Sequence, residues 1–360
     1  MSAGLVHAGP ERRRPLRRLA RVVVAGVLAL AFSGCTSSDG GASSGSTGVV
    51  PPAPAAWSVV REGLPGALLS VWGTSATDVW TVGADARDGS GPLVWHYDGA
   101  KWERVATGET KGDLWWVHGF AGGPIFMGGA GGVILRYEGG KFTKMTTPGT
   151  ETVFGLWGES PASMWAVGGT LDTKGFAWRL QGDQWTPEPS LPAAVVADAG
   201  LWKVHGRSAS DVWLVGSRGI AFHWNGTVLE QQQTGVGVSI FTAHSSQGRF
   251  AAVGGTASGF VLENDGTGWK KATDATYGLT GIALGAGDTG YAVGSYGSVY
   301  VRDEKGWREE DTKLNIQLDL HGVWIDPSGG VWSVGGRTAS FPLTSGFLLH
   351  KGDPVKSGGF

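Results

Sequence analysis

The sequence predicts an all-β protein, a seven-bladed β-propeller with four-stranded antiparallel blades whose ring is closed by an N-terminal strand. The 360-residue chain holds 63 glycines and only 17% charged residues, and no long segment has helical periodicity. A segment of the type SVWGTSATDVWTVG, from Ser70 to Gly83, occurs seven times, in four similar copies and three more divergent ones. Successive copies are 38 to 48 residues apart, which is the range of one propeller blade per repeat.

Each repeat contains two apolar runs around a polar turn, and the second run ends on glycine. The closing glycines are Gly83, Gly129, Gly168, Gly216, Gly254, Gly294 and Gly335. A third apolar run follows, such as GPLVWHYDG from Gly91, and a fourth begins with an aromatic or apolar residue such as Trp102. Val228 or Leu229 takes that place in the fourth copy. Four short runs joined by tight turns predict a four-stranded antiparallel meander.

The seventh copy lacks its fourth run, because no tryptophan strand follows Leu349. The segment Ala56 to Val60, AWSVV, is similar to KWERV at Lys101 to Val105 and precedes the first copy. We therefore expect the N-terminal strand to complete the last blade and to cover an edge that an open array would expose. The predicted propeller spans residues 56–352, and residues 353–360 form a tail.

The repeat resembles the Trp-Gly and Asp-Val-Trp propeller repeats of bacterial exported proteins. It is also similar to Asp-box and photosystem-assembly propellers, through the turns that join Asp98-Gly99 to Trp102 and Asp265-Gly266 to Trp269. Double glycines such as Gly128-Gly129 resemble those of kelch repeats. The resemblance implies the fold and no particular activity, because propellers carry many unrelated functions.

The N-terminus has the pattern of a signal peptide, predicted at residues 1–34. Six arginines between Arg12 and Arg21 precede an apolar run of 11 residues, Val22 to Phe32. As a helix this run would be about 16 Å long, too short for a hydrocarbon core of about 30 Å. The arginine pairs leave twin-arginine export open beside the general secretory route.

The segment Ala31 to Cys35, AFSGC, resembles the lipobox of bacterial lipoproteins. That resemblance implies that Cys35, the one cysteine of the chain, carries a diacylglycerol and an N-acyl chain such as palmitate. Thr36 follows it in place of aspartate, which implies the outer membrane if the cell is Gram-negative. Several acyl chains would hold the protein on the membrane where a single one would not.

Residues 35–55 are rich in Ser, Gly, Thr and Pro and predict a disordered tether that reaches about 25 Å. The chain without residues 1–34 has 23 basic and 30 acidic side chains, so nucleic acid is not an expected partner. The expected partners are the membrane, through the lipid, and an envelope protein or polysaccharide. The propeller itself is expected to be a monomer.

The tryptophans admit two interpretations, a carbohydrate-stacking surface or packing between blades. Packing is favoured, because most tryptophans recur at equivalent positions of the repeat, and a recurring position is best explained by a recurring contact. The tryptophans at repeat positions are Trp72, Trp80, Trp157, Trp165, Trp213, Trp324 and Trp332. Trp115 and Trp116 are adjacent, so strand alternation predicts opposite faces and different roles for them.

Polar residues at repeat positions could hold a metal or support the fold, and the second is favoured. His118, His205 and His244 replace the tryptophan of other copies and are expected to be hydrogen-bonded aromatic substitutes. Asp78 and Asp211 should hold a turn through backbone N–H groups, with a calcium loop as the alternative. A further set shares one strand position and predicts a polar row, namely His96, Arg136, Arg179 and His223.

No catalytic, metal-binding or cofactor-binding residue is predicted, since the domain has no G-x-S-x-G, Walker or HExxH element. The favoured function is a non-enzymatic envelope lipoprotein that binds or scaffolds a protein or polysaccharide. Partner contacts are expected where the copies differ in length, at Ala84 to Gly91, Thr170 to Lys174 and Glu188 to Gly200. The alternatives are a carbohydrate-active hydrolase or lyase with carboxylates around the channel, and an assembly factor for envelope proteins.

Overall fold

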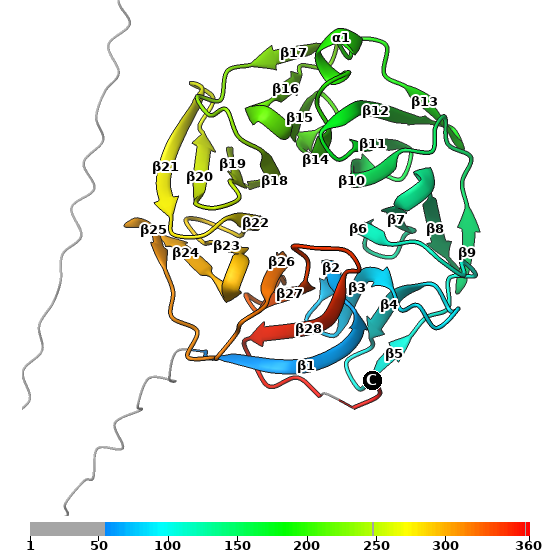
Figure 1. Cartoon of the computed structure of the whole chain (residues 1–360), viewed down its shortest axis with the longest axis vertical. Helices are drawn as coiled ribbons and strands as arrows, with labels where there is room; N and C mark the ends of the chain where they lie inside the picture. The colour runs from blue at the N-terminus through cyan, green and yellow to red at the C-terminus, as the bar shows by residue number, and fades with distance from the viewer. Residues whose placement is uncertain (1–54, 247, 357) are drawn as a thin grey trace, which may run out of the picture. The chain divides into compact units, whose positions relative to one another are not determined.

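The computed structural model describes residues 55–246, 248–356 and 358–360, so the predicted signal peptide, Cys35 and nearly all of the tether lie outside the described residues. The described chain forms seven four-stranded antiparallel sheets arranged as blades around a central axis (Figure 1). This confirms the predicted seven-bladed β-propeller. In the described part of the chain, no helix has the length and apolar character needed to cross a bilayer.

The strands of each blade are given from the axis outward, with blades numbered in chain order. Blade 1 contains β2 (Leu68–Ser75), β3 (Asp78–Asp85), β4 (Pro92–Tyr97) and β5 (Trp102–Arg104). Blade 2 contains β6 (Leu114–Gly119), β7 (Ile125–Gly129), β8 (Ile134–Glu138) and β9 (Lys141–Lys144). Blade 3 contains β10 (Thr152–Ser160), β11 (Ser163–Thr170), β12 (Thr173–Gln181) and β13 (Gln184–Pro187). Blade 4 contains β14 (Leu201–Ser208), β15 (Asp211–Gly216), β16 (Ala221–Trp224) and β17 (Leu229–Gln232). Blade 5 contains β18 (Ile240–Ser246), β19 (Arg249–Gly254), β20 (Gly259–Asn264) and β21 (Trp269–Ala275). Blade 6 contains β22 (Leu279–Leu284), β23 (Gly290–Gly294), β24 (Val299–Asp303) and β25 (Gly306–Glu309). Blade 7 contains β26 (Asp319–Ile325), β27 (Val331–Arg337), β28 (Thr344–Lys351) and β1 (Trp57–Gly66).

The ring is closed by β1, which forms the outer strand of blade 7 beside β28 (Figure 1). The two strands pair antiparallel, with Trp57 opposite Lys351 and Leu64 opposite Gly346. The predicted closure is thereby confirmed, and the strand extends six residues beyond the predicted end at Val60. Trp57 is buried at 6% exposure, so closure also adds core contacts.

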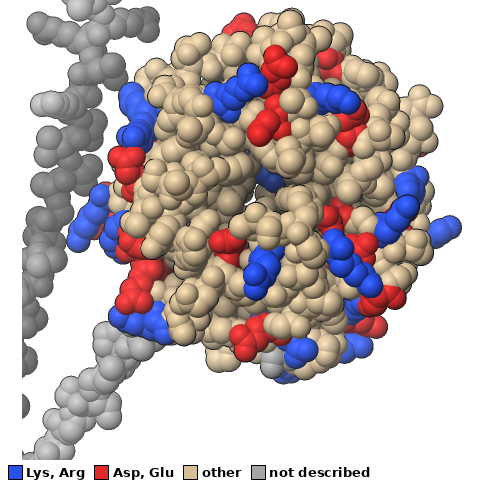
Figure 2. Space-filling view, in the orientation of Figure 1, with Lys and Arg blue, Asp and Glu red and all other residues tan. Residues whose placement is uncertain are grey.

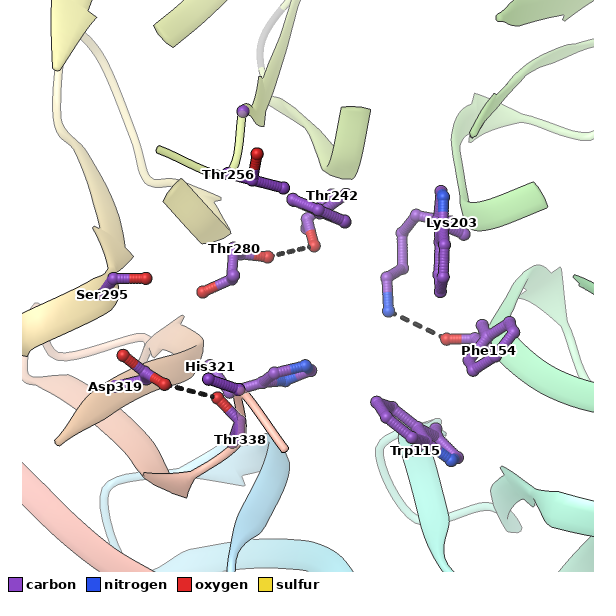
Figure 3. Close-up of a pocket in the computed structure, with 14 residues that line it drawn as sticks. Trp115, Phe154, Lys203, Thr242, Thr256, Thr280, Ser295, Asp319, His321 and Thr338 are labelled. Atoms are coloured by element: carbon purple, nitrogen blue, oxygen red, sulfur yellow. Dashed lines mark hydrogen bonds between the residues drawn. The ribbon is translucent and has the colours of Figure 1, made fainter. Parts of the chain in front are cut away.

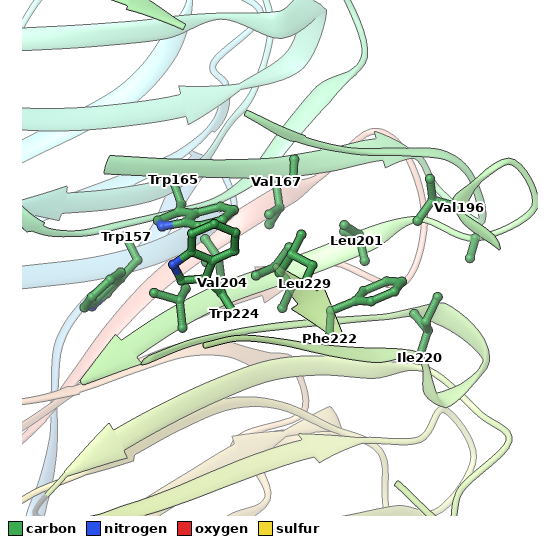
Figure 4. Close-up of a cluster of buried hydrophobic side chains, with 14 residues drawn as sticks. Trp157, Trp165, Val167, Val196, Leu201, Val204, Ile220, Phe222, Trp224 and Leu229 are labelled. Carbon is green, nitrogen blue, oxygen red and sulfur yellow. The ribbon is translucent and has the colours of Figure 1, made fainter. Parts of the chain in front are cut away.

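The Trp-Gly pair of the repeat has a structural explanation in the contact between inner strands. A Cβ atom at Gly119 would lie 2.5 Å from the ring of Trp72, and one at Gly206 would lie 2.4 Å from Trp157. These two glycines follow His118 and His205, and at Gly73 a Cβ atom would lie 2.8 Å from the ring of Trp324. At these three positions the glycine makes room for a tryptophan ring of the preceding blade. Figure 4 shows the cluster of buried apolar side chains between blades 3 and 4, in which Trp165 and Trp224 pack edge to face.

The burial of the repeat tryptophans confirms packing as their role. Trp332, Trp165 and Trp80 are at most 3% exposed, and Trp157 and Trp213 are each 7% exposed. The remaining two, Trp72 and Trp324, are half-buried and pack against apolar clusters of neighbouring blades.

The C-terminal tail extends past blade 7 and packs on blade 1. The ring of Phe360 lies 5.0 Å from that of Trp102 and 4.8 Å from that of Trp95. The amide of Trp102 donates to the carbonyl of Gly358 at 2.9 Å. The tail thus forms a second connection across the point where the ring closes.

Candidate functional site

The inner strand of every blade contains a β-bulge near its start. The pairing with the second strand shifts by one residue at Leu69, Trp115, Phe154, Trp202, Phe241, Thr280 and His321. A bulge redirects the side chain of the extra residue. Six of these seven side chains, all except Leu69, line a cavity of about 370 Å³. This is the candidate site, and Figure 2 shows the disc hollowed at its centre.

Four aromatic side chains from consecutive blades form one wall of the cavity, here called the aromatic arc: Trp115, Phe154, Trp202 and Phe241. Figure 3 labels the first two of them. Ring centroids lie 5.1 Å apart for Trp115 and Phe154, 4.8 Å for Phe154 and Trp202, and 5.8 Å for Trp202 and Phe241. The imidazole of His321 continues the arc 5.8 Å from Trp115. These contacts give a continuous aromatic surface around more than half of the axis.

Five hydroxyl side chains of the lining are here called the hydroxyl wall: Thr242, Thr256, Thr280, Ser295 and Thr338. Thr242 donates to the carbonyl of Thr280 at 2.6 Å, and Thr280 donates to that of Leu320 at 2.7 Å. Asp319, the one carboxylate of the lining, accepts a hydrogen bond from Thr338 at 3.1 Å. The cavity is therefore apolar on one side and hydrogen-bonding on the other (Figure 3).

Lys203 is the one lysine or arginine in the cavity lining and is only 4% exposed. Its Nζ donates to the carbonyl of Phe154 at 2.8 Å and lies 3.5 Å from the centre of the Trp116 ring. Burial holds the pKa of Lys203 well below its usual value of 10.5. Among the described residues, no carboxylate lies within ion-pair distance of this amine.

The predicted histidines lie three residues after the bulge residue of their inner strands, and each forms a hydrogen bond to the next blade. His118 Nε2 lies 3.2 Å from the carbonyl of Gly158, His205 Nδ1 lies 3.0 Å from Ser245 Oγ, and His244 Nδ1 accepts from the amide of Leu284 at 3.2 Å. Burial lowers the pKa of His118 and His244 to about 4, and that of His205 falls well below 6.5 for the same reason.

This geometry confirms the prediction that the histidines are hydrogen-bonded aromatic substitutes. His205 and His244 have ring centroids 4.2 Å apart, yet within the described ranges no three His, Cys, Asp or Glu side chains are placed to hold a metal ion. His321, which the sequence analysis did not single out, belongs to the cavity. Its Nδ1 donates to the carbonyl of Leu69 at 2.7 Å, and burial lowers its pKa to about 4.

Trp115 and Trp116 differ in role, as predicted. Trp115 lines the cavity, whereas Trp116 donates its indole N–H to the carbonyl of Leu156 in blade 3 at 2.9 Å. The polar row is confirmed as well, and its four side chains are 26% to 31% exposed. They cover aromatic rings of the core, as His96 does by stacking on Trp80 at 4.1 Å.

Asp78 and Asp211 hold their turns through side-chain donors, which corrects the prediction of backbone N–H bonds. Asp78 Oδ1 accepts from the indole N–H of Trp80 at 3.2 Å and lies 2.8 Å from His96 Nε2. Asp211 has the same contact with His223 at 2.9 Å. Across the turns, Thr74 Oγ1 donates to Asp78 Oδ2, and Arg207 Nε donates to Asp211 Oδ2 at 2.6 Å. The reason is strand alternation, because residues two apart share a face and the aspartate is therefore directed at Trp80.

The connections at the cavity end of the ring form one surface, here called the cavity face. It comprises the loops between the second and third strands of each blade and those that lead into each inner strand. The three length-variable segments, Ala84 to Gly91, Thr170 to Lys174 and Glu188 to Gly200, all lie on it, the last with the short helix α1 (Ala193–Val196). The structure thus brings together the predicted contact segments and the cavity.

Exposed apolar side chains gather on the cavity face. Seven large apolar residues of the described chain are exposed, and five of them lie in these connections: Leu171, Val238, Tyr277, Tyr296 and Phe341. Tyr296 and Phe341 are the most exposed, at 62% and 63%. The other two, Val59 and Val228, lie on the outer strand β1 and in a turn at the opposite end.

Backbone strain is concentrated on the same face. All seven non-glycine residues with positive φ in the described chain lie in or next to these connections: Arg87, Leu171, Lys174, Arg218, Tyr296, Lys313 and Ser345. Blade 2 has Gly131 where blades 4 and 6 have Arg218 and Tyr296, with φ values of 70°, 56° and 56° in similar turns. A left-handed non-glycine residue costs on the order of 1 kcal/mol, and such strain clusters at functional sites.

Comparisons with known proteins identify the fold and no family. No family model matches the chain, and no curated protein sequence matches it. A structure of YCF48 bound to D1 peptide aligns over 84% of this chain and 100% of its own, with a TM-score of 0.60 and 13% identity. YCF48 from Cyanidioschyzon merolae aligns over 82% of this chain and 98% of its own, with a TM-score of 0.62 and 17% identity. The WD40 propeller of Doa1 aligns over 82% of this chain and 97% of its own, with a TM-score of 0.59 and 14% identity.

Proposed function

We propose that this protein is a non-enzymatic lipoprotein of the bacterial cell envelope that binds a protein or polysaccharide partner on its cavity face. The observation that carries the proposal is the coincidence of two independent features on that face. Of the residues that the structure describes, five of the seven exposed large apolar ones and all seven strained non-glycine ones are found there. Exposed apolar groups and retained strain both lower stability, and both are typical of a surface that is selected for contact.

Rigid presentation is the mechanism that we propose for binding. Packing between blades holds the seven blades in place, and β1, from the start of the domain, pairs with β28 of the last blade and closes the ring. The strained turns hold side chains such as Tyr296 and Leu171 away from the core before any partner arrives. Because the packed blades fix the backbone of these turns, binding should cost less conformational entropy than it would for flexible loops.

The structural neighbours support a partner of this kind. YCF48 is a propeller of the same fold in complex with a peptide in one of the similar structures. The envelope location rests on the lipobox-like segment and Cys35, which would place the disc close to a membrane through the tether. A role in assembling other envelope proteins is a special case of the same binding function.

Substitutions of apolar residues on the cavity face test the proposal. Leu171→Asp combined with Tyr296→Asp removes two exposed apolar groups, and aspartate accepts the left-handed backbone of both positions. The matched control combines Val59→Asp with Val228→Asp, which are exposed away from this face. Crosslinking in intact cells followed by co-purification from membranes should recover a partner with wild type and control only.

Equal recovery with both double variants would overturn the assignment of the face. Purified protein should also be incubated with a glycan panel. Turnover that is abolished by Asp319→Asn would replace the binding proposal with the carbohydrate-active enzyme.

A further inference from the structure

The buried amine of Lys203 lacks the partner that another buried lysine of this protein has. Lys351 is 17% exposed in its side chain and forms an ion pair with Glu310, and it donates to the hydroxyl of Tyr291 at 3.2 Å. Lys203 is more deeply buried and is matched only by one carbonyl and one aromatic ring. An ammonium group has three donors, and a buried charge is costly unless it is paired.

The position of this amine indicates an anion that comes from outside the protein. Lys203 lines the cavity beside Phe154 of the aromatic arc, and Thr280 and Ser295 of the hydroxyl wall lie across the cavity from it (Figure 3). The other groups of the lining that can carry charge are Asp319 and His321. Because Asp319 would repel a doubly charged phosphate, the singly charged carboxylate fits this cavity better.

The two walls indicate what carries the carboxylate. The C–H groups of a sugar ring pack on the electron-rich faces of aromatic side chains, and the arc offers four such side chains. Sugar hydroxyls both donate and accept, which suits the hydroxyl wall and the carboxylate of Asp319. A cavity of about 370 Å³ is within the size range of small-molecule sites, about 300–1,000 Å³.

We propose that the axial cavity binds a uronic acid unit of an acidic polysaccharide, with its carboxylate on Lys203, its ring on the aromatic arc and its hydroxyls on the hydroxyl wall. This rests on the proposed function, of which it specifies the polysaccharide form. The peptide alternative, a C-terminal carboxylate with an apolar side chain, offers the hydroxyl wall and Asp319 only backbone N–H and C=O groups, whereas each sugar ring offers several hydroxyls. The saccharide uses both walls.

The test is calorimetric titration of the full protein in detergent with trigalacturonate, its neutral methyl ester and a short peptide that ends in phenylalanine. We expect trigalacturonate to bind and the methyl ester to bind at least tenfold more weakly. Lys203→Met should lower the affinity for trigalacturonate at least tenfold. The matched control is Lys111→Met, an exposed lysine on the same face outside the cavity lining, and it should bind like wild type.

Equal affinity for the acid and its ester would overturn the role of Lys203, and this comparison needs no variant to fold. Binding of the peptide alone would overturn the saccharide. If no probe binds, the cavity proposal fails, while the proposed function is judged separately by whether the Leu171/Tyr296 double variant still recovers a partner.

Discussion

Replacing Trp57 by alanine should destabilise the whole propeller, although the residue lies at the start of the domain in its outermost strand. Trp57 is 6% exposed and belongs to a cluster with Leu320, Val331 and other apolar residues of blades 6 and 7. Its ring meets that of Tyr291 in blade 6 edge to face, with centroids 6.0 Å apart. The side chain therefore connects the closing strand both to its own blade and to the neighbouring one.

Truncation of a buried tryptophan to alanine costs about 3–5 kcal/mol, against a total stability of about 5–15 kcal/mol for a typical domain. No hydrogen bond is lost, because the described residues offer no partner to the indole N–H of Trp57. The loss should come from packing alone. With β1 weakened, the edge of β28 would also be exposed and the variant should aggregate more readily.

Urea unfolding followed by circular dichroism measures the effect, with Val59→Ala as the control on the same strand. Val59 is 45% exposed, so its truncation should change the free energy of unfolding by less than about 0.5 kcal/mol. A Trp57→Ala midpoint that matches wild type, or one that matches the control, would refute ring closure as the source of stability.

Three further predictions follow from burial and from the N-terminal sequence. Burial lowers the pKa of His118, His244 and His321 from 6.5 to about 4, so these groups should not affect the free energy of unfolding above pH 6.5. Between pH 6.5 and 4 each histidine should lower the free energy of unfolding by up to about 1.4 kcal/mol for every pH unit of acidification. A free energy of unfolding that stays constant over this range in urea titrations would contradict the prediction. Lys203→Met should raise the melting temperature at pH 7, because burial lowers the pKa of Lys203 and disfavours its charged form. The gain in melting temperature should shrink as the pH rises towards 10.5. A variant less stable than wild type would show that the amine stabilises the fold. Cys35→Ser should move the protein from the membrane fraction to the soluble fraction, and retention in membranes would exclude the lipid anchor.

The architecture could be predicted because its signals are local and repeated. Each closing glycine, such as Gly83, marks the same point of a blade, so one pattern gave strand number, order and blade count. The closing strand was predictable for a related reason, since a seventh repeat without its fourth run must obtain that strand elsewhere. Trp57 supplied the match, because its segment looks like the strand that begins near Trp102.

The site was not predictable in the same way, because it is formed by bulges that exist only when strands pair. A signal was nevertheless present in the sequence. An aromatic residue precedes the Trp-Gly or His-Gly pair by three positions, as Trp115 precedes His118 and Phe154 precedes Trp157. Strand alternation alone places these residues on a blade surface, whereas the bulge places them on the axis. Lys203 gave no signal, because a single lysine in an inner strand has no repeated counterpart.

The tail illustrates a second limit of repeat-based reasoning. Phe360 packs on blade 1 through contacts with Trp95 and Trp102, yet it lies in a glycine-rich segment outside every repeat. Its partner strand is nearly 260 residues away in sequence, and no local pattern indicates that distance.

Crosslinking and co-purification from membranes test most directly whether the cavity face is a binding surface. Wild type and the Val59/Val228 control should recover the same partner, protein or polysaccharide. The Leu171/Tyr296 variant should recover none, and its melting temperature should not fall, because aspartate tolerates the left-handed backbone of both positions. Recovery of that partner by the Leu171/Tyr296 variant at the wild-type level would show that the cavity face is not the binding surface.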